Sequence, residues 1–130
     1  MAHLPGAERL LANLTSASST TLKGAEFELE FAVKHANEIE EIERLLEVIH
    51  GGEKRIDFVL KGNVFVNVKN IDWNSYNQFV LESYTNRLVE EATSFFKYNP
   101  SVIKYVFKGN VPDSVRQALE AAGIIVEVIP

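Results

Sequence analysis

The sequence predicts a single small α/β domain in which helices flank a mixed central sheet. Its 130 residues are enough for one domain with its own core. The proportions of hydrophobic (46%) and charged (24%) residues are those of an ordinary globular protein. Helix-type and β-type segments alternate along the chain, and a closing helix-strand pair predicts that the last two strands are parallel. We expect residues 1–21 to form a leader or linker and residues 22–130 to form the domain.

Composition and charge exclude several classes of protein. The chain has no cysteine, which excludes disulfides, thiol nucleophiles and zinc-thiolate sites. No apolar run approaches the ~20 residues that span a bilayer, so we expect a soluble protein. The net charge of -5 argues against non-specific coating of nucleic acid. Residues 1–53 hold 4 basic and 10 acidic side chains, whereas residues 54–130 hold 9 and 8, so a polyanion is expected on the second part.

The first predicted element after the leader is a long helix. The Ser/Thr-rich stretch of residues 15–21 gives little reason for helix, but from Lys23 the sequence is strongly helix-forming. Small or apolar residues then recur at spacings of three and four. They are Ala32, His35, Ile39, Ile42, Leu46 and Ile49. We therefore expect one amphipathic helix that ends at Gly51-Gly52 and exposes the acidic run EIEEIERLLE to solvent.

The second part of the chain predicts a hairpin followed by alternating helices and strands. Two β-rich runs, residues 56–60 and 64–71, are joined by the turn Lys61-Gly62-Asn63. Asn99-Pro100 and Gly123 are expected to end the two helices that follow. These later elements are a helix over residues 75–96, a strand over 102–107, a helix over 112–122 and a strand over 124–129.

A candidate site lies on the predicted hairpin. Asp57 is in its first strand, and Asn67 and Lys69 point to one face of the second because side chains alternate along a strand. Glu28 continues the inward stripe of the preceding helix. Carboxylates beside a lysine suit Mg²⁺ or Mn²⁺ and activation of water for attack on a phosphodiester. The same residues are equally compatible with an ordinary solvated surface.

Two sequence motifs resemble known nucleases. The segment KGAEFELE (residues 23–30), followed by RIDFVLKGNVFVNVKN (residues 55–70), resembles the PD-(D/E)XK, or restriction-endonuclease-like, superfamily. KGAEFELE also resembles the start of archaeal Holliday-junction resolvases, which implies a metal-site role for Glu28. Residues 95–129 are similar to the nuclease domains of contact-dependent growth-inhibition and related polymorphic toxins. The resemblance implies catalytic roles for Glu28, Asp57, Asn67 and Lys69, of which the first three would hold metal.

One position departs from the PD-(D/E)XK pattern. Asn67 stands where the superfamily has Asp or Glu, and its amide brings no negative charge to a metal. Three interpretations stay open: an inactivating substitution, a site completed by another acid such as Glu82, or a domain that has lost activity. Gln78 and Tyr84 are candidate supporting residues, or else an exposed polar group and a packing aromatic.

The resemblance implies a nuclease that acts on DNA or tRNA. It further implies a toxin effector domain, secreted within a larger protein and acting in the cytoplasm of a target cell, with a cognate immunity protein as partner. The alternatives are a non-catalytic nucleic-acid-binding or protein-interaction domain, and a junction-resolving endonuclease that acts as a dimer. Three lysines, Lys97, Lys104 and Lys108, are candidate phosphate contacts or ordinary surface lysines.

Overall fold

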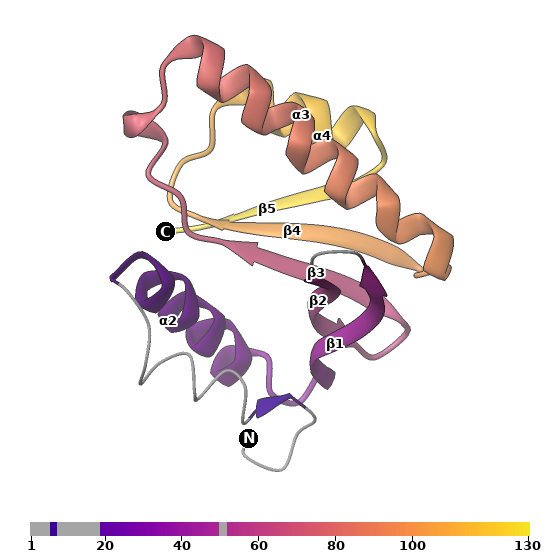
Figure 1. Cartoon of the computed structure of the whole chain (residues 1–130). Helices are drawn as coiled ribbons and strands as arrows, with labels where there is room; N and C mark the ends of the chain where they lie inside the picture. The colour runs from indigo at the N-terminus through magenta and orange to yellow at the C-terminus, as the bar shows by residue number, and fades with distance from the viewer. Residues whose placement is uncertain (1–5, 8–18, 50–51) are drawn as a thin grey trace.

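The computed structural model describes residues 6–7, 19–49 and 52–130. Five strands form one sheet, with α2 on one face and α3 and α4 on the other (Figure 1). In chain order the elements are α2 (Ser19–Lys34), β1 (Ile39–Ile49), β2 (Gly52–Leu60), β3 (Val64–Lys69), the 3-10 helix η1 (Trp73–Ser75), α3 (Gln78–Ser94), the 3-10 helix η2 (Phe95–Tyr98), β4 (Val102–Lys108), α4 (Asp113–Ala121) and β5 (Ile125–Ile129). The predicted α/β class, with a mixed sheet between helices, is confirmed.

The strands lie in the sheet in the same order as in the sequence. β1, β2 and β3 are antiparallel neighbours, while β3, β4 and β5 are parallel. The hairpin at Lys61-Gly62-Asn63 is as predicted, and Gly62 and Asn63 both have the positive φ expected of its turn. The predicted parallel pairing of the last two strands is also confirmed, since α4 carries the chain back to the same end of the sheet.

The alternation of side chains divides the core into two layers. On the α2 face, Phe27 and Phe31 of the helix pack with Phe58, Val66 and Val106 of the strands. The other face carries a second cluster under α3 and α4, and its most deeply buried members are Ile56, Val59, Phe65, Phe95, Ile103, Tyr105, Phe107, Val115 and Leu119. Successive residues of β3 and β4 therefore point into opposite layers. Asn67 and Lys69 alternate with Val66 and Val68, so they face α3.

The prediction of one long helix after Lys23 is wrong for the second half of that segment. The helix ends at Lys34, and Ile39–Ile49 form strand β1, which pairs antiparallel with β2. The acidic run EIEEIERLLE is therefore part of an edge strand and not a helix face. Gly52 begins β2 and so does not follow a helix.

Irregularities in β1 explain why its sequence has helical spacing. The register against β2 shifts between Ile39 and Glu41 and again between Leu45 and Glu47. Each shift places an extra residue in β1, so residues three apart can fall on one face of the sheet. Ile39 and Ile42 accordingly both enter the core cluster on the α2 face. Between the two shifts Glu43 has a φ of 51°, a conformation uncommon outside glycine.

The start of the first helix also differs from the prediction. Helix α2 begins at Ser19, inside the Ser/Thr-rich stretch that was expected to be non-helical. Ala7 is buried in the core cluster on the α2 face, so part of the predicted leader packs on the domain. Most of residues 1–18, and His50 and Gly51, lie outside the described residues.

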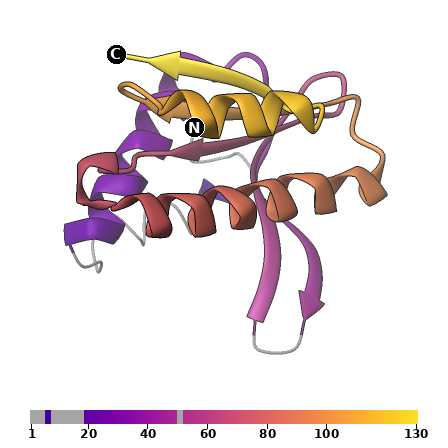
Figure 2. The ribbon, with the colours of Figure 1, turned by 90° about the horizontal axis from the view of Figure 1, so that it is seen from above.

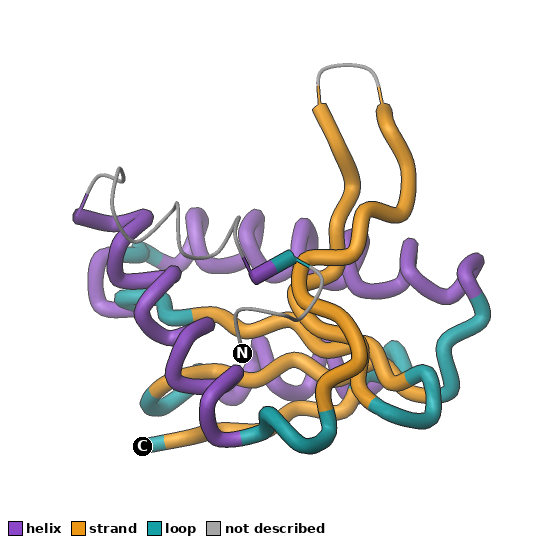
Figure 3. The backbone as a smooth tube through the Cα atoms, turned by 90° about the horizontal axis from the view of Figure 1, so that it is seen from below, coloured by secondary structure: helices purple, strands orange, loops and turns teal. Residues whose placement is uncertain are grey.

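The β1–β2 hairpin extends beyond the rest of the sheet. β2 pairs with β3 only over Phe58, Val59 and Leu60, and beyond that point it pairs with β1 alone. Residues 45–49 and 52–55 therefore form a two-stranded projection, which we call the arm. Figures 2 and 3 show it from opposite sides, projecting away from the sheet next to α3.

Candidate functional site

Asp57 and Asn67 interrupt the ladder between β2 and β3. The register that pairs Phe58 with Val66 would next pair Asp57 with Asn67. Side chains replace the backbone partners here: the Asp57 N–H donates to Asn67 Oδ1 at 3.0 Å, and the Val68 N–H donates to Asp57 Oδ2 at 2.9 Å. Both side chains are thereby fixed by backbone groups at the point where the arm separates from β3.

Glu91 of α3 completes a polar network above these strands. Its Oε1 accepts a hydrogen bond from the Tyr105 hydroxyl and lies 3.4 Å from Asn67 Nδ2. Lys69 Nζ is also 3.4 Å from the same oxygen. Asn67 and Tyr105 are buried and sit opposite each other in the parallel β3–β4 register, which brings the amide to 3.2 Å from the hydroxyl. Three donors thus converge on one carboxylate oxygen.

The ionisation of Asp57 is finely balanced. Its pKa is raised from 3.8 to about 6, because burial and, to a smaller extent, the neighbouring charges of Glu43 and Glu91 outweigh the lowering effects of Lys69 and the Val68 N–H. At neutral pH the carboxylate is therefore largely ionised, in surroundings that disfavour its charge. A cation bound next to Asp57 would relieve this cost.

Lys69 is held as a cation. Burial alone lowers its pKa, but the carboxylates of Glu91 and Asp57 outweigh burial, so the pKa is raised above the usual value. An ammonium group with a raised pKa cannot remove a proton from water at neutral pH. With no metal bound, this state favours one of the two predicted roles of the lysine, positioning of water with neutralisation of charge, while deprotonation of water stays a prediction.

The structure brings together some of the predicted residues and separates others. Asp57, Asn67 and Lys69 converge, and Tyr84 is close enough to affect the pKa of Lys69. Gln78 and Glu82 are exposed near the start of α3, where Gln78 Nε2 bonds Glu82 Oε1 at 3.2 Å. The acid that contacts Asn67 is Glu91 and not Glu82, because Glu91 lies two and a half helical turns further along α3.

Glu28 occupies a different position from the other predicted metal ligands. It is half-buried on α2, which packs on the opposite face of the sheet from Asn67 and Lys69. A strand of the sheet cannot present one side chain to both helices at once. Glu28 therefore does not share the sheet face on which Asn67 and Lys69 lie. The metal-site role that the resemblance implies for it stays a prediction.

Three residues of the site, Glu91, Tyr105 and Glu43, were not predicted from the sequence. Tyr105 could have been found from alternation, since it shares its strand face with Ile103 and Phe107. Glu91 lies three residues after Leu88, on the buried side of α3, and an acid at such a position is a detectable signal. Glu43 could not be placed, because the bulged strand that positions it next to Asp57 was predicted to be helix.

The carboxylate and amide oxygens of this site are of the type that a small hard cation prefers. Among residues 6–7, 19–49 and 52–130, no group of three or more His, Cys, Asp or Glu side chains is arranged to hold a metal ion. Mg²⁺, however, usually takes only one or two carboxylates from a protein and keeps several waters. Asp57 and Glu91, with the amide of Asn67 between them, meet that requirement in number and chemistry.

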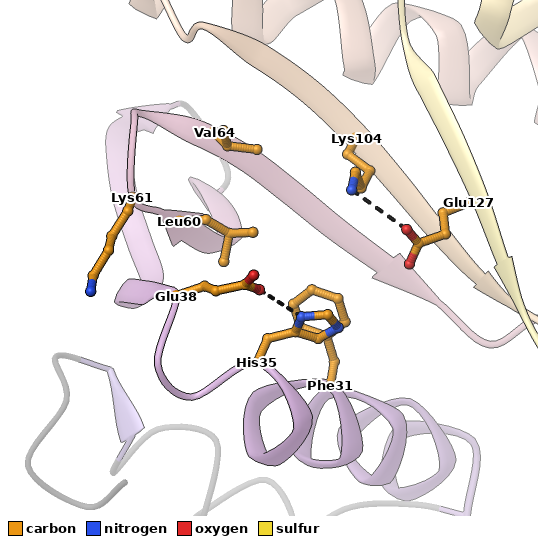
Figure 4. A pocket seen from close by; sticks show the side chains of 8 residues that line it. All are labelled: Phe31, His35, Glu38, Leu60, Lys61, Val64, Lys104 and Glu127. Carbon is orange, nitrogen blue, oxygen red and sulfur yellow. Dashed lines mark hydrogen bonds and ion pairs between the residues drawn. The ribbon is translucent and has the colours of Figure 1, made fainter.

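A separate pocket lies on the α2 face (Figure 4). Phe31, Leu60 and Val64 supply its apolar surface. His35 stacks on Phe31 and bonds Glu38 at 2.8 Å, and Lys104 pairs with Glu127 at 3.5 Å. Lys108 on the same face pairs with Glu30, so Lys104 and Lys108 are both remote from the Asp57 site, whereas Lys97 pairs with Glu47 of the arm.

Comparison with known proteins adds no relative. No family model, curated protein or solved structure matches this chain. No helix in the described part of the chain is long and apolar enough to cross a membrane.

Proposed function

We propose that this chain is a metal-dependent nuclease of the PD-(D/E)XK type in which Glu91 supplies the acid that residue 67 lacks. The observation that carries the proposal is the contact of one Glu91 oxygen with both Asn67 and Lys69. These two residues occupy the acid and lysine positions of the motif. A carboxylate from α3 therefore reaches the place where the motif expects one from β3.

Each residue has a chemical role in phosphodiester hydrolysis. Asp57 and Glu91 would hold Mg²⁺ or Mn²⁺, and Asn67 orients both through its bonds to the Asp57 N–H and to the Glu91 carboxylate. A cation held there would supply Lewis-acid activation of a water and of the phosphate. The Lys69 ammonium stabilises the negative charge that develops on the phosphoryl oxygens. Tyr105 fixes the Glu91 carboxylate by donating a hydrogen bond from its hydroxyl group.

The resemblance of residues 95–129 to polymorphic toxin domains supports a toxin effector role. In that role the substrate is DNA or tRNA in the cytoplasm of a target cell, and a cognate immunity protein blocks the site. Residues 23–30 support a junction-resolving endonuclease instead. The junction-resolving enzyme would be a dimer with a preference for four-way junctions, which analytical ultracentrifugation and a junction-binding assay measure directly.

A second candidate function is nucleic-acid binding without catalysis. The observation that favours it is that the polar groups of the network bind one another. Lys69, Asn67 and Tyr105 all direct donors at the Glu91 carboxylate. A polar cluster whose hydrogen bonds are all made internally is able to stabilise the fold without any catalytic role. Metal dependence separates this candidate from the nuclease.

The test is cleavage of plasmid DNA and total tRNA with Mg²⁺ or Mn²⁺. Glu91→Gln should abolish cleavage, with Asp57→Ala as the blank. The matched control is Glu90→Gln, which changes an exposed neighbour on the same helix and should cleave as the parent does. Glu82→Gln tests the acid that sequence alone suggested.

Each outcome selects one interpretation. Loss of cleavage in Glu91→Gln, with Glu90→Gln and Glu82→Gln active, supports the proposal. If the parent is inert and Asn67→Glu cleaves, residue 67 had silenced the site and Glu91 does not replace it. If no variant cleaves and calorimetry finds no metal binding, the nuclease proposal is wrong and the binding domain takes its place.

A further inference from the structure

The two edges of the sheet differ in how open they are to a further strand. An edge strand presents unpaired N–H and C=O groups, which proteins often protect with bulges or charged residues. At the β1 edge the register shifts twice, Glu43 has a positive φ, and the sequence is acidic. At the other edge, β5 pairs with β4 over the whole of Ile125–Ile129 without a shift (Figure 1). Residues 125–129 therefore lack the protection that β1 has.

The backbone of β5 fixes which of its groups point out of the sheet. Gly109 directly follows β4, and its N–H donates to the Ile129 carbonyl at 2.7 Å, so this carbonyl faces β4. The N–H and C=O of one residue lie on the same side of a strand, and successive residues alternate between the two sides. The N–H and C=O groups of Val126 and Val128 therefore point outward. They offer two donors and two acceptors to another strand.

The side chains of β5 are accessible along the strand. All of its residues are at least partly exposed, and Ile125 is 48% exposed. Strands β3 and β4, which have neighbours on both sides, instead contain runs of buried residues. Ile129 packs on the α2 face, and Val126 packs on the face of α3 and α4. A strand added next to β5 would thus cover apolar surface on both faces of the sheet.

Glu127 gives this edge a charge preference. Its Oε1 lies 3.5 Å from Lys104 Nζ, and its side chain is 41% exposed. A carboxylate can accept hydrogen bonds at both oxygens, so this one long contact leaves room for a second cation. The residue opposite Glu127 on an added strand would lie within about 5.5 Å of it between Cβ atoms. A lysine or arginine there is attracted, and an acid there is repelled.

A second copy of this chain is a poor partner for β5. An antiparallel pairing centred on Glu127 sets two Glu127 carboxylates opposite each other. A pairing centred on Val128 sets Val126 opposite Pro130, which has no N–H. A pairing centred on Val126 sets Val128 opposite Ile124, whose N–H already bonds a carbonyl of α4 at 3.0 Å. The net charge of -5 also opposes self-association.

We propose that β5 is a docking edge for an extended segment of another protein, which adds a strand to the sheet. The segment carries a basic residue opposite Glu127, flanked by β-branched apolar residues. The outward backbone groups of β5 supply affinity, and Glu127 selects the central residue of the segment. This inference is independent of the proposed nuclease function, because β5 contributes no residue to the Asp57 site.

The probe is the blocked peptide Gly-Thr-Val-Lys-Val-Thr-Gly, with a Glu-centred version as its control. Its sequence reads the same in both directions, so it serves for parallel and antiparallel pairing alike. NMR titration of the full chain should show the Lys-centred peptide binding about 5-fold more tightly than the control. The Val126 and Val128 amides should shift and become protected from hydrogen exchange. The Glu127 amide faces β4 and should be protected before the peptide is added.

Three variants test the backbone and charge contacts separately. Glu127→Lys should reverse the preference, so that the Glu-centred peptide binds more tightly. Val128→Pro should abolish binding, because it removes an outward N–H that the β4 ladder does not use. Val128→Thr keeps that N–H and should bind as the parent does. Circular dichroism melting checks that each variant folds. A peptide N-methylated at its Val and Lys residues removes the same hydrogen bonds from the other side and needs no variant.

Four outcomes would each overturn the proposal. They are absence of changes at the Val126 and Val128 amides, an unchanged peptide preference in Glu127→Lys, binding of the N-methylated peptide as tightly as the parent peptide, and a β5-mediated dimer of the chain alone in sedimentation. The last result would assign the edge to a second copy. Reversal of the preference by Glu127→Lys, together with loss of binding on N-methylation, supports strand addition at β5.

Discussion

The ammonium of Lys69 lies 3.4 Å from the carboxylate of Glu91, although the two residues belong to different elements on either side of η1. This ion pair joins the end of β3 to the last part of α3. It raises the pKa of Lys69 and places a carboxylate next to Asn67. The network around it leads to three predictions, and the backbone at the end of η2 leads to a fourth.

Asp57→Asn should stabilise the protein at pH 8 and leave stability nearly unchanged at pH 4. The pKa of Asp57 is about 6 in the folded protein against an ordinary 3.8, so the folded state holds the proton more tightly than the unfolded state. Stability from this group is present below pH 4 and is lost as pH rises to 6, at a cost of about 3 kcal/mol. Urea unfolding at both pH values measures the effect. Glu120→Gln is the control, and an equal gain at the two pH values would contradict this explanation.

Asn67→Asp should destabilise the protein in the absence of metal and create a stronger metal site. The new carboxylate replaces an amide that donates toward Glu91 and Tyr105, so two acids would face each other in a buried position. The expected loss is about 2–4 kcal/mol. Millimolar Mn²⁺ should restore about 2–3 kcal/mol by binding the folded state. Thermal melting measures both effects. Absence of any metal-dependent rise in Tm would show that the three carboxyl groups do not form a cation site.

Tyr105→Phe should cost about 1–3 kcal/mol of stability, because it removes a buried hydroxyl that bridges Glu91 and Asn67. The ring keeps its packing, so the loss reports the hydrogen bonds. Tyr76→Phe is the matched control, since the Tyr76 ring packs on Trp73 and Tyr84 and its hydroxyl has no hydrogen bond among the described residues. Chemical denaturation of both variants gives the comparison. Equal losses would mean that the Tyr105 hydroxyl contributes nothing particular to the network.

Asn99→Gly should change stability by only a few tenths of a kcal/mol, whereas Asn99→Ala should cost about 1 kcal/mol. Asn99 ends η2 with φ 56° and ψ 45°, and its N–H bonds the Phe96 carbonyl at 3.0 Å. Asparagine and glycine tolerate this left-handed conformation and alanine does not. Asn86→Ala in the exposed middle of α3 is the control and should be neutral or slightly stabilising. Identical effects of the glycine and alanine variants would refute the backbone explanation.

The later elements could be predicted because each has a local signal. Lys61-Gly62-Asn63 gave the hairpin, and the Pro112 start and Gly123 end gave α4. β1 could not be predicted, because its bulges reproduce the three-residue spacing of a helix at Ile39 and Ile42. Only pairing with β2 makes that segment a strand, and a single chain segment does not reveal its partner.

The sequence by itself determined that Asn67 and Lys69 share one face of a strand, because alternation of side chains is a local property of β-structure. It also determined that Asp57 precedes them on the adjacent strand of a hairpin. The tertiary structure decided which acid meets them: docking of α3 on the sheet brings Glu91, and not Glu82, to Asn67. It also decided that α2, with Glu28, covers the opposite face. The position in which a helix docks depends on how both core layers pack. The spacing of residues along one element therefore does not predict it.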